Sequence, residues 1–206
     1  MSAFFTIVIP SYLGHYPNAA THRDKKIIRA LNSVFQQTFD DYEIQFIADG
    51  CEASYSLIAD LYSHDSRLHC TLLPKQPKWS GLPRNIAIRQ GGGKYAVYLD
   101  IDDFWGVQHL EGIWRSLQAC NSPVWGFFND FLGQNSGRFL RRHCDPEIKF
   151  KNGTSNIVHR TDSGAQWTDG YLHDYLFIKQ LLSIAPPALM DCGEYCVCHI
   201  PKVLDI

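Results

Sequence analysis

Three carboxylates directly follow an apolar run in the middle of the chain. The run 95–99 has the composition of a buried strand, and Asp100, Asp102 and Asp103 come immediately after it. Because alternate residues of an extended chain share a face, Asp100 and Asp102 are expected to lie together. Carboxylates this close raise each other's pKa unless a positive group lies between them. A divalent cation that also binds phosphate oxygens would supply that charge, and the alternative is a solvated strand end that caps the next helix.

Regular strand and helix patterns alternate ahead of these carboxylates and must position them. Apolar, β-branched runs predict strands at 4–10, 42–48, 68–73 and 95–99. Helical spacing and a proline in a first turn predict helices at 25–37, at 53–62 and from Gly81. This alternation predicts an α/β fold in which a mostly parallel sheet is covered by helices on both faces.

Three polar segments fall at the carboxyl ends of these strands, which is the edge where such sheets bind ligands. They are 10–12, Asp49-Gly50 and 100–103. The sequence therefore predicts one cleft built from three separate loops.

The second half of the chain has a weaker pattern. Helices are expected at 107–120 and 171–182, and strands at 125–128 and 195–200. Between them, 129–165 is rich in Gly, Asn, Asp and Arg without clear periodicity, which is typical of substrate-facing loops. No repeat, low-complexity tract or linker interrupts the chain, so we predict a single domain over 1–206.

Composition argues against several classes of protein. A net charge of −2 over 206 residues gives no electrostatic case for a nucleic-acid partner. No apolar run approaches the roughly 18 residues of a membrane span, and no signal peptide is evident, so we predict a cytoplasmic protein without an integral membrane segment. The seven scattered cysteines predict free thiols, with structural zinc at 192–199 as an alternative that lacks CxxC spacing.

Five segments in order resemble family 2 glycosyltransferases of GT-A fold. The matching segments are Phe5–Tyr12 (first strand), Ile28–Ile44 (first helix and second strand), Ala48–Gly50 (in place of Asp-Asp-Gly-Ser), Gly81–Ile88 (an arginine-asparagine helix start) and Leu99–Asp103 (the metal motif). The match is continuous over about residues 4–105. The resemblance implies a Rossmann-like sheet in which 1–105 bind the nucleotide sugar, whereas 106–206 supply the acceptor site and the catalytic base.

The resemblance assigns the carboxylates to a metal site. Asp102 would bind Mn²⁺ or Mg²⁺, and Asp100 would face the ribose or the metal, so that the charge on the leaving diphosphate is neutralised. Some GT-A enzymes add a late histidine as a third ligand, for which His199 and His159 are the candidates. The other interpretation of each is an ordinary packed or exposed histidine.

Four further residues match positions that bind the nucleotide in this family. Asp49 would accept a hydrogen bond from the base, typically uracil, and Pro10 and Tyr12 would line the pocket. Arg84 would lie near the nucleotide or its phosphates, which a guanidinium suits. The alternatives are a plain turn at Asp49, a packed aromatic at Tyr12 and a surface residue at a helix start at Arg84.

An inverting transferase also needs a carboxylate that removes the proton of the acceptor hydroxyl. His173-Asp174-Tyr-Leu-Phe177 is similar to the family's Glu-Asp-Tyr/Trp-x-Leu, which implies that Asp174 is the base, although histidine replaces glutamate. Asp169 is the alternative base, and Thr168-Asp169-Gly170 is also ordinary chemistry for a helix start.

The resemblance thus implies a metal-dependent, inverting glycosyltransferase. It would move a sugar from a nucleotide-diphosphate sugar, with UDP favoured, to a hydroxyl of a saccharide or lipid-linked acceptor in polysaccharide or glycolipid assembly. A basic segment could receive an anionic or lipid-linked acceptor at the inner face of a membrane, or form a solvated face. It comprises Arg138, Arg141, Arg142, Lys149 and Lys151.

Two other functions compete with this one. Leu99–Asp103 also resembles the Asp-x-Asp strand end of haloacid-dehalogenase-type phosphatases, but it ends the fourth strand rather than the first, and Phe104 stands where those enzymes carry threonine. The second alternative is a degenerate transferase domain that binds nucleotide or a partner without turnover. The departures from the family pattern around Asp49-Gly50 and at His173 favour it.

Overall fold

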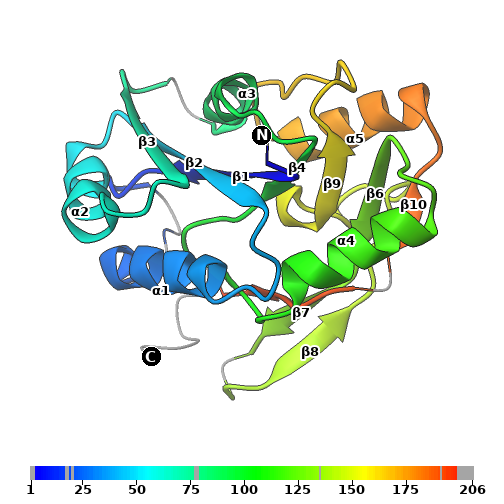
Figure 1. Cartoon of the computed structure of the whole chain (residues 1–206), viewed down its shortest axis with the longest axis horizontal. Coiled ribbons are helices and arrows are strands. Elements are labelled where there is room, and N and C mark those ends of the chain that lie inside the picture. The colour runs from blue at the N-terminus through cyan, green and yellow to red at the C-terminus, as the bar shows by residue number, and fades with distance from the viewer. Residues whose placement is uncertain are drawn as a thin grey trace.

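The chain forms two sheets with helices around them (Figure 1). The computed structural model describes residues 3–16, 19, 21–76, 79–134, 136–190 and 192–198. A seven-stranded sheet has the order β10-β6-β9-β4-β1-β2-β3, and a four-stranded sheet has the order β5-β11-β7-β8.

The first half folds as the sequence predicts. Its elements are β1 (Phe5–Ser11), α1 (Arg23–Phe35), β2 (Tyr42–Asp49), α2 (Glu52–Tyr62), β3 (Leu68–Leu73), α3 (Gly81–Gln90) and β4 (Tyr95–Tyr98). β1 pairs in parallel with β2 and β4, and β2 pairs in parallel with β3. The predicted parallel sheet is confirmed, and the carboxyl ends of these four strands lie along one edge.

The second half contains more regular structure than its sequence suggests. Its elements are β5 (Phe104–Trp105), α4 (His109–Ala119), β6 (Trp125–Phe128), β7 (Asp130–Gly133), β8 (Phe139–Arg142), the 3₁₀ helix η1 (Thr154–Asn156), β9 (Ile157–Arg160), α5 (His173–Ile184), β10 (Ala188–Met190) and β11 (Tyr195–Val197). The expectation of irregular loops over 129–165 is wrong, because β7, β8, η1 and β9 lie there. β9 is antiparallel to both of its neighbours, β4 and β6. β7, β8 and β9 are short and mix apolar with polar residues, so unlike the apolar runs of β4 and β6 they give no clear signal in the sequence.

Helices cover both faces of the large sheet, which confirms the predicted layers. α1, α2 and α4 lie on one face, where Ile27 of α1 and Ile113 of α4 pack into the same core. α3 and α5 lie on the other face, where Ala87 and Phe177 join a second core. Figure 1 shows the two layers on opposite sides of the strands. Each helix buries one stripe of apolar residues against the sheet and leaves the rest to solvent.

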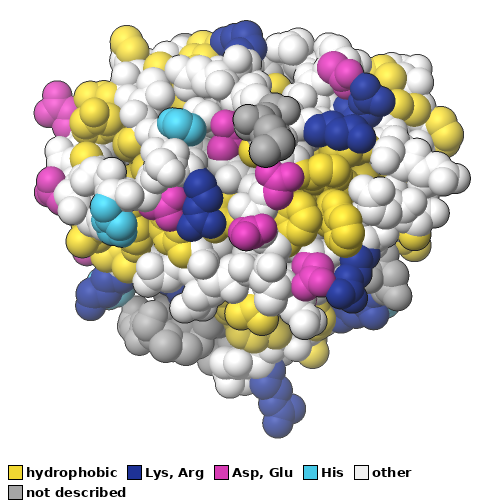
Figure 2. Space-filling model, viewed as in Figure 1, with side chains coloured by type: hydrophobic (Ala, Val, Ile, Leu, Met, Phe, Trp, Pro, Cys, Tyr) yellow, Lys and Arg dark blue, Asp and Glu magenta, His cyan; other side chains and the backbone are white. Residues whose placement is uncertain are grey.

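The surface and the cysteines agree with the composition. Figure 2 shows Lys and Arg side chains intermixed with Asp and Glu on the face in view. Among the described residues, none of the helices combines the length and the apolar character needed to cross a bilayer. No disulfide joins any of the seven cysteines, all of which lie in the described part of the chain.

Candidate functional site

A cavity of about 820 Å³ lies at the edge where the parallel strands end. Seven of the ten candidate residues named from the sequence line it: Pro10, Tyr12, Asp49, Arg84, Asp100, Asp102 and Asp174. The three exceptions are Asp169, which is exposed and does not line the cavity, His159, which is buried in β9, and His199, which lies outside the described residues. The predicted convergence of three strand-end loops is therefore observed.

The loop after β1 is shaped so that Tyr12 borders the cavity. The Arg23 guanidinium donates hydrogen bonds to the carbonyl oxygens of Tyr12, Leu13 and Gly14, at 2.7, 2.8 and 2.7 Å. A Cβ on Gly14 would lie only 2.2 Å from the Tyr12 ring, so any larger residue at this position would displace the ring from its place against the loop. The loop and its tyrosine are thus held by contacts within the first half of the chain.

Asp49 is buried at the end of β2 and already has two hydrogen-bond donors. Lys75 Nζ donates to Oδ2 at 2.6 Å, and the Gln76 amide donates to Oδ1 at 2.7 Å. Gly50, with φ of 62°, turns the chain so that its amide reaches the Leu73 carbonyl at 2.8 Å. A carboxylate has about four acceptor positions, so a further donor such as a nucleobase N–H has room to bind.

Lys75 is a residue of the site that sequence reasoning missed. Its ammonium lies 4.6 Å from the centroid of the Tyr12 ring as well as against Asp49. β3 is parallel to β2, so the segment after it must reach the same edge as the other three strand ends. Applying the strand-end rule to β3 as well would have found this lysine.

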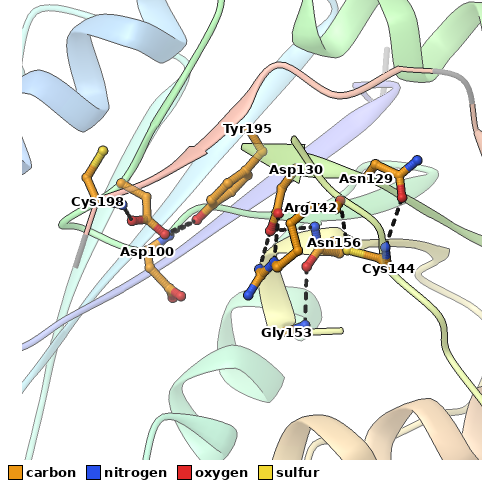
Figure 3. A network of polar contacts seen from close by, with 10 residues as sticks. Asp100, Asn129, Asp130, Arg142, Cys144, Gly153, Asn156, Tyr195 and Cys198 are labelled. Carbon is orange, nitrogen blue, oxygen red and sulfur yellow. Dashed lines mark hydrogen bonds and ion pairs between the residues drawn. The ribbon is translucent and has the colours of Figure 1, made fainter. Parts of the chain in front are cut away.

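The three carboxylates after β4 have different surroundings. Asp103 is buried, and it accepts hydrogen bonds from Tyr195 Oη at 2.9 Å and from the Cys198 amide at 2.6 Å. Burial and the charges of Asp102 and Asp100 raise the pKa of Asp103 well above its ordinary value. Figure 3 shows Tyr195 and Cys198 reaching this region from the C-terminal strand. All three aspartates border the cavity. Both carboxylate oxygens of Asp103 bind the C-terminal segment, however, so Asp100 and Asp102 are the two candidates for a metal site.

Arg84 connects Asp100 to the region of the candidate base. Its Nη2 lies 3.1 Å from Asp100 Oδ1, and its Nη1 lies 3.2 Å from His173 Nε2. The guanidinium is almost fully buried and lies 5.0 Å above the Trp167 ring. The surface position that was the alternative for Arg84 is thus wrong.

The donor set at Asp100 and Asp102 fits a hard divalent cation. Both carboxylates line one cavity, and Mg²⁺ or Mn²⁺ is commonly held by one or two carboxylates with phosphate and water oxygens as the other ligands. Within the described ranges, no three His, Cys, Asp or Glu side chains form a ready metal cluster. A metal here would therefore take the rest of its ligands from substrate and solvent.

His159 does not lie at this site, so its candidacy as a metal ligand is wrong. It is fully buried in β9, with Nε2 2.5 Å from Tyr98 Oη and Nδ1 2.8 Å from the Arg160 carbonyl. Burial lowers the pKa of His159 to about 4, so the ring is neutral at pH 7. The packed histidine that was the alternative interpretation is the one observed.

Asp174, in the first turn of α5, is the candidate base that the fold brings into the cavity. Its Oδ1 accepts a hydrogen bond from Thr154 Oγ1 and lies 3.1 Å from His173 Nε2. Burial acts to raise its pKa, but the hydrogen bond and charge of His173, together with Arg84 and Thr154, hold the pKa below its ordinary value. Asp174 is therefore an ionised, oriented carboxylate whose side chain is about one third exposed to the cavity.

Two hydrogen bonds between α3 and the segment before α5 set the position of this helix start. Asn85 Nδ2 donates to the Trp167 carbonyl and the Trp167 amide donates to Asn85 Oδ1, both at 2.8 Å. A Cβ on Gly81 would lie 2.2 Å from the Thr168 carbonyl oxygen, so this close approach requires glycine. The arginine-asparagine helix start thus contributes one residue to the cavity and one to the scaffold.

An ion pair between a buried carboxylate and a half-buried arginine holds the segment that carries Thr154. Asp130, which is fully buried in β7, accepts hydrogen bonds from Arg142 Nε at 2.8 Å and from Asn156 Nδ2 at 3.0 Å. Asn156 Oδ1 in turn accepts from the Gly153 amide at 3.2 Å, as Figure 3 shows. This network joins the β7–β8 hairpin to η1. Nothing in the sequence pattern identifies Thr154, because its partners come from distant segments.

Comparison with known proteins places this architecture in a family. The sequence profile described as "Glycosyl transferase family 2" matches residues 6–175. The chain is 28% identical over 195 residues to poly(ribitol-phosphate) beta-N-acetylglucosaminyltransferase TarS of Staphylococcus aureus, which covers 93% of this chain and 32% of that protein. It is also 25% identical over 138 residues to UDP-Glc:alpha-D-GlcNAc-diphosphoundecaprenol beta-1,3-glucosyltransferase WfgD of Escherichia coli, covering 66% of this chain and 50% of that protein.

Solved structures share the fold. The crystal structure of TarS residues 1–349 with UDP-GlcNAc superposes with a TM-score of 0.73 at 20% identity, over 96% of this chain and 58% of that one. The mannosyltransferase PcManGT of Pyrobaculum calidifontis, in complex with GDP-Man and Mn²⁺, gives a TM-score of 0.64 at 12% identity, over 96% of this chain and 57% of that one. The predicted GT-A fold is confirmed. Since the profile spans most of the sequence and the relatives agree with it, the chain belongs to glycosyl transferase family 2.

Proposed function

We propose that this chain is the catalytic domain of a glycosyltransferase that moves a sugar from a nucleoside-diphosphate sugar to an acceptor hydroxyl, with inversion. The observation that carries the proposal is the composition of the cavity. It holds two strand-end carboxylates, Asp100 and Asp102, together with Arg84 and the ionised Asp174 from a distant part of the chain. The family supports the same reaction class.

Asp174 is the proposed general base. As the acceptor oxygen attacks the anomeric carbon, Asp174 takes its proton, and the bond to the diphosphate breaks on the opposite face of the sugar. The low pKa of this carboxyl keeps it ionised at neutral pH, and Thr154 and His173 orient it. Asp169 stays the alternative base, although it does not line the cavity.

The opposite end of the cavity is assigned to the diphosphate and the nucleoside. Asp102, with Asp100, would hold Mn²⁺ or Mg²⁺, and the bound metal would neutralise charge on the leaving diphosphate. Tyr12 and Asp49 would border the base, with Arg84 near the phosphates. The complexes of TarS with UDP and UDP-GlcNAc favour a UDP-sugar, and the Mn²⁺ in the PcManGT structure supports a metal.

The acceptor is proposed to be a saccharide or a lipid-linked saccharide of a polysaccharide or glycolipid. The names of two relatives support this class, since one refers to poly(ribitol-phosphate) and the other to GlcNAc-diphosphoundecaprenol. We place the reaction in the cytoplasm, with peripheral contact at the inner face of a membrane if the acceptor is lipid-linked. The chain spans only about a third of the length of TarS.

Calorimetric titration of UDP, GDP and dTDP, each with Mn²⁺ and with EDTA, tests the donor assignment. We expect one nucleotide to bind in a metal-dependent way, and UDP most tightly. Tight binding of GDP alone would overturn the UDP assignment. Failure of all three to bind a protein shown to be folded would overturn the donor site.

One observation favours the alternative of a nucleotide- or partner-binding domain without turnover. His173 stands where the family pattern carries glutamate, and its Nε2 lies 3.1 Å from Asp174 Oδ1, so a histidine rather than an acid contacts the candidate base. Metal-dependent UDP affinity without release of UDP from any UDP-sugar would support this alternative. Release of UDP that depends on Asp174 would exclude it.

A further inference from the structure

A row of aromatic side chains, half-buried at the cavity and exposed farther out, leads away from Asp174. We call Trp79, Tyr171 and Phe150 the aromatic shelf. The Trp79 ring lines the cavity and lies 5.9 Å from the His173 ring, centroid to centroid. The Tyr171 ring lies 5.9 Å from Trp79 and 6.3 Å from Phe150. The shelf is thus continuous from the candidate base to the outer surface.

The outer part of the shelf is unusually exposed. Tyr171 has 72% and Phe150 has 64% of its surface open to solvent. Phe150 also adopts φ of 66°, a conformation that bulky L residues rarely take. Exposed aromatics that no core requires, and a backbone outlier that presents one of them, are features typical of binding surfaces.

The chemistry around the rings favours an occupant with one apolar face and polar edges. Lys149 Nζ lies 4.9 Å from the centroid of the Phe150 ring and 5.9 Å from that of Tyr175, so a hydrogen-bond donor flanks the shelf. The Tyr171 hydroxyl adds a second polar group. The C–H face of a pyranose ring can pack on aromatic rings while its hydroxyls meet such groups.

We propose that the aromatic shelf binds the pyranose ring of the acceptor, placing its hydroxyl toward Asp174. The inference rests on the proposed function and assigns residues to the acceptor site that the resemblance did not. A lipid surface fits less well, because the rings lead into a cavity lined by carboxylates rather than onto a broad apolar face. The nucleoside is assigned to the other end of the cavity, around Tyr12 and Asp49.

Saturation-transfer NMR on the full chain tests the shelf without knowledge of the natural acceptor. The probes are the methyl glycosides of glucose, galactose, mannose and N-acetylglucosamine, each measured with UDP and Mn²⁺ present. We expect transfer to the C–H protons of at least one glycoside. Phe150→Ala and Tyr171→Ala should each weaken its affinity by roughly two- to tenfold, as loss of an aromatic contact does.

Tyr55→Ala is the matched control, since Tyr55 is an exposed tyrosine on α2 and should leave the signal unchanged. No transfer to any glycoside, or equal transfer in all variants, would overturn the shelf. Adsorption to phosphatidylglycerol vesicles that is lost in Phe150→Ala and Tyr171→Ala, without any sugar signal, would overturn it in favour of a membrane contact.

UDP affinity, measured on the same samples, separates this inference from the proposed function. Intact metal-dependent UDP binding without a sugar signal would overturn the shelf and leave the donor site standing. A sugar signal that depends on Phe150 and Tyr171, in a protein that binds no nucleotide, would support the shelf and overturn the transferase proposal.

Discussion

The two ends of the cavity are held by different kinds of structure. At the nucleotide end, Tyr12, Asp49 and Asp100 follow parallel neighbouring strands, whose backbone ladders set their spacing. At the other end, Asp174 depends on α5, η1 and the segment before α5, which side-chain hydrogen bonds join to the rest of the molecule. Backbone pairing thus builds one end, and a few buried polar side chains build the other.

This difference has an energetic consequence. A backbone ladder tolerates most single side-chain changes, because its hydrogen bonds use no side-chain atoms. A buried polar group that loses its partner bears its full desolvation cost, so a network such as Asp130–Arg142–Asn156 fails at a single substitution. We therefore expect the base end to be the more fragile, and the following changes are ordered from the largest expected effect to the smallest.

Asp174→Asn should show the largest difference between the two ends of the cavity, because it should affect catalysis and leave nucleotide binding unchanged. It removes the proposed base and should lower the release of UDP from a UDP-sugar by about 10²–10⁴-fold, while UDP affinity at the nucleotide end is unchanged. Coupled UDP detection and calorimetry measure the two quantities. Asp169→Asn is the control with full activity, and the reverse pattern, with only Asp169→Asn inactive, would show that the base assignment is wrong.

Asp102→Ala should have the opposite selectivity. Loss of the carboxylate should abolish Mn²⁺-dependent UDP binding. Removing a group that only supports a metal ligand typically weakens metal affinity by roughly 10–100-fold, so the loss of a ligand itself should weaken binding by more than that. Titration of UDP with Mn²⁺ and with EDTA measures it. Asp60→Ala, at an exposed position on α2, should bind as the unchanged protein does. Equal binding with and without metal in the unchanged protein would contradict the metal assignment.

Arg142→Met tests the hydrogen-bond network of Asp130, Arg142 and Asn156 that supports η1. It leaves the fully buried Asp130 carboxylate without its charged partner and should lower the free energy of unfolding by about 3–5 kcal/mol. Urea denaturation measures this loss, and hydrogen exchange should show it first in β7, β8 and η1. Arg115→Met removes an exposed pair with Glu111 and should change little. A small loss of unfolding free energy in Arg142→Met would mean that this network does not stabilise η1 and the part of the cavity around Asp174.

Acid should also destabilise the second half first. Burial lowers the pKa of His109 to about 3 and that of His159 to about 4, below the ordinary value near 6.5. Between pH 6.5 and 4 only the unfolded chain protonates them, so each costs about 1.4 kcal/mol of stability per unit fall in pH. His109→Phe should reduce this slope, because it removes a group that only the unfolded chain protonates. Neither ring nitrogen of His109 has a hydrogen-bond partner among the described residues, so phenylalanine can replace the ring without the loss of such a bond. His64→Phe, at an exposed position, should not reduce the slope.

Thr154→Val should have the smallest effect and should act through pH. Removing this hydrogen bond to Asp174 raises the pKa of the carboxyl toward its ordinary value. Activity requires the ionised base and is lost as pH falls through that pKa, so the acidic limb of the rate profile should move to higher pH. UDP release measured against pH tests this, with Thr71→Val as the control. An unmoved limb would show that Thr154 does not tune the base.

Much of the nucleotide end follows from sequence alone, for a physical reason. Apolar runs rich in β-branched residues locate β1, β2 and β4, and parallel neighbours bring their carboxyl ends to one edge. Asp49, Asp100 and Asp102 are therefore predictable as a group. Lys75 was predictable by the same rule applied to β3. The hydrogen bond from Lys75 to Asp49 was not predictable, because it depends on the turn at Gly50.

The base end was decided by the tertiary structure. The resemblance favours Asp174 as the base and leaves Asp169 as the alternative. The hydrogen bonds between Asn85 and Trp167 and the contact with Thr154 bring Asp174 into the cavity. The contacts that hold it join segments far apart in the chain, and four-residue strands such as β9 carry no period of their own. Local patterns determined which elements form, whereas long-range side-chain pairing decided which of the two candidate carboxylates lines the cavity.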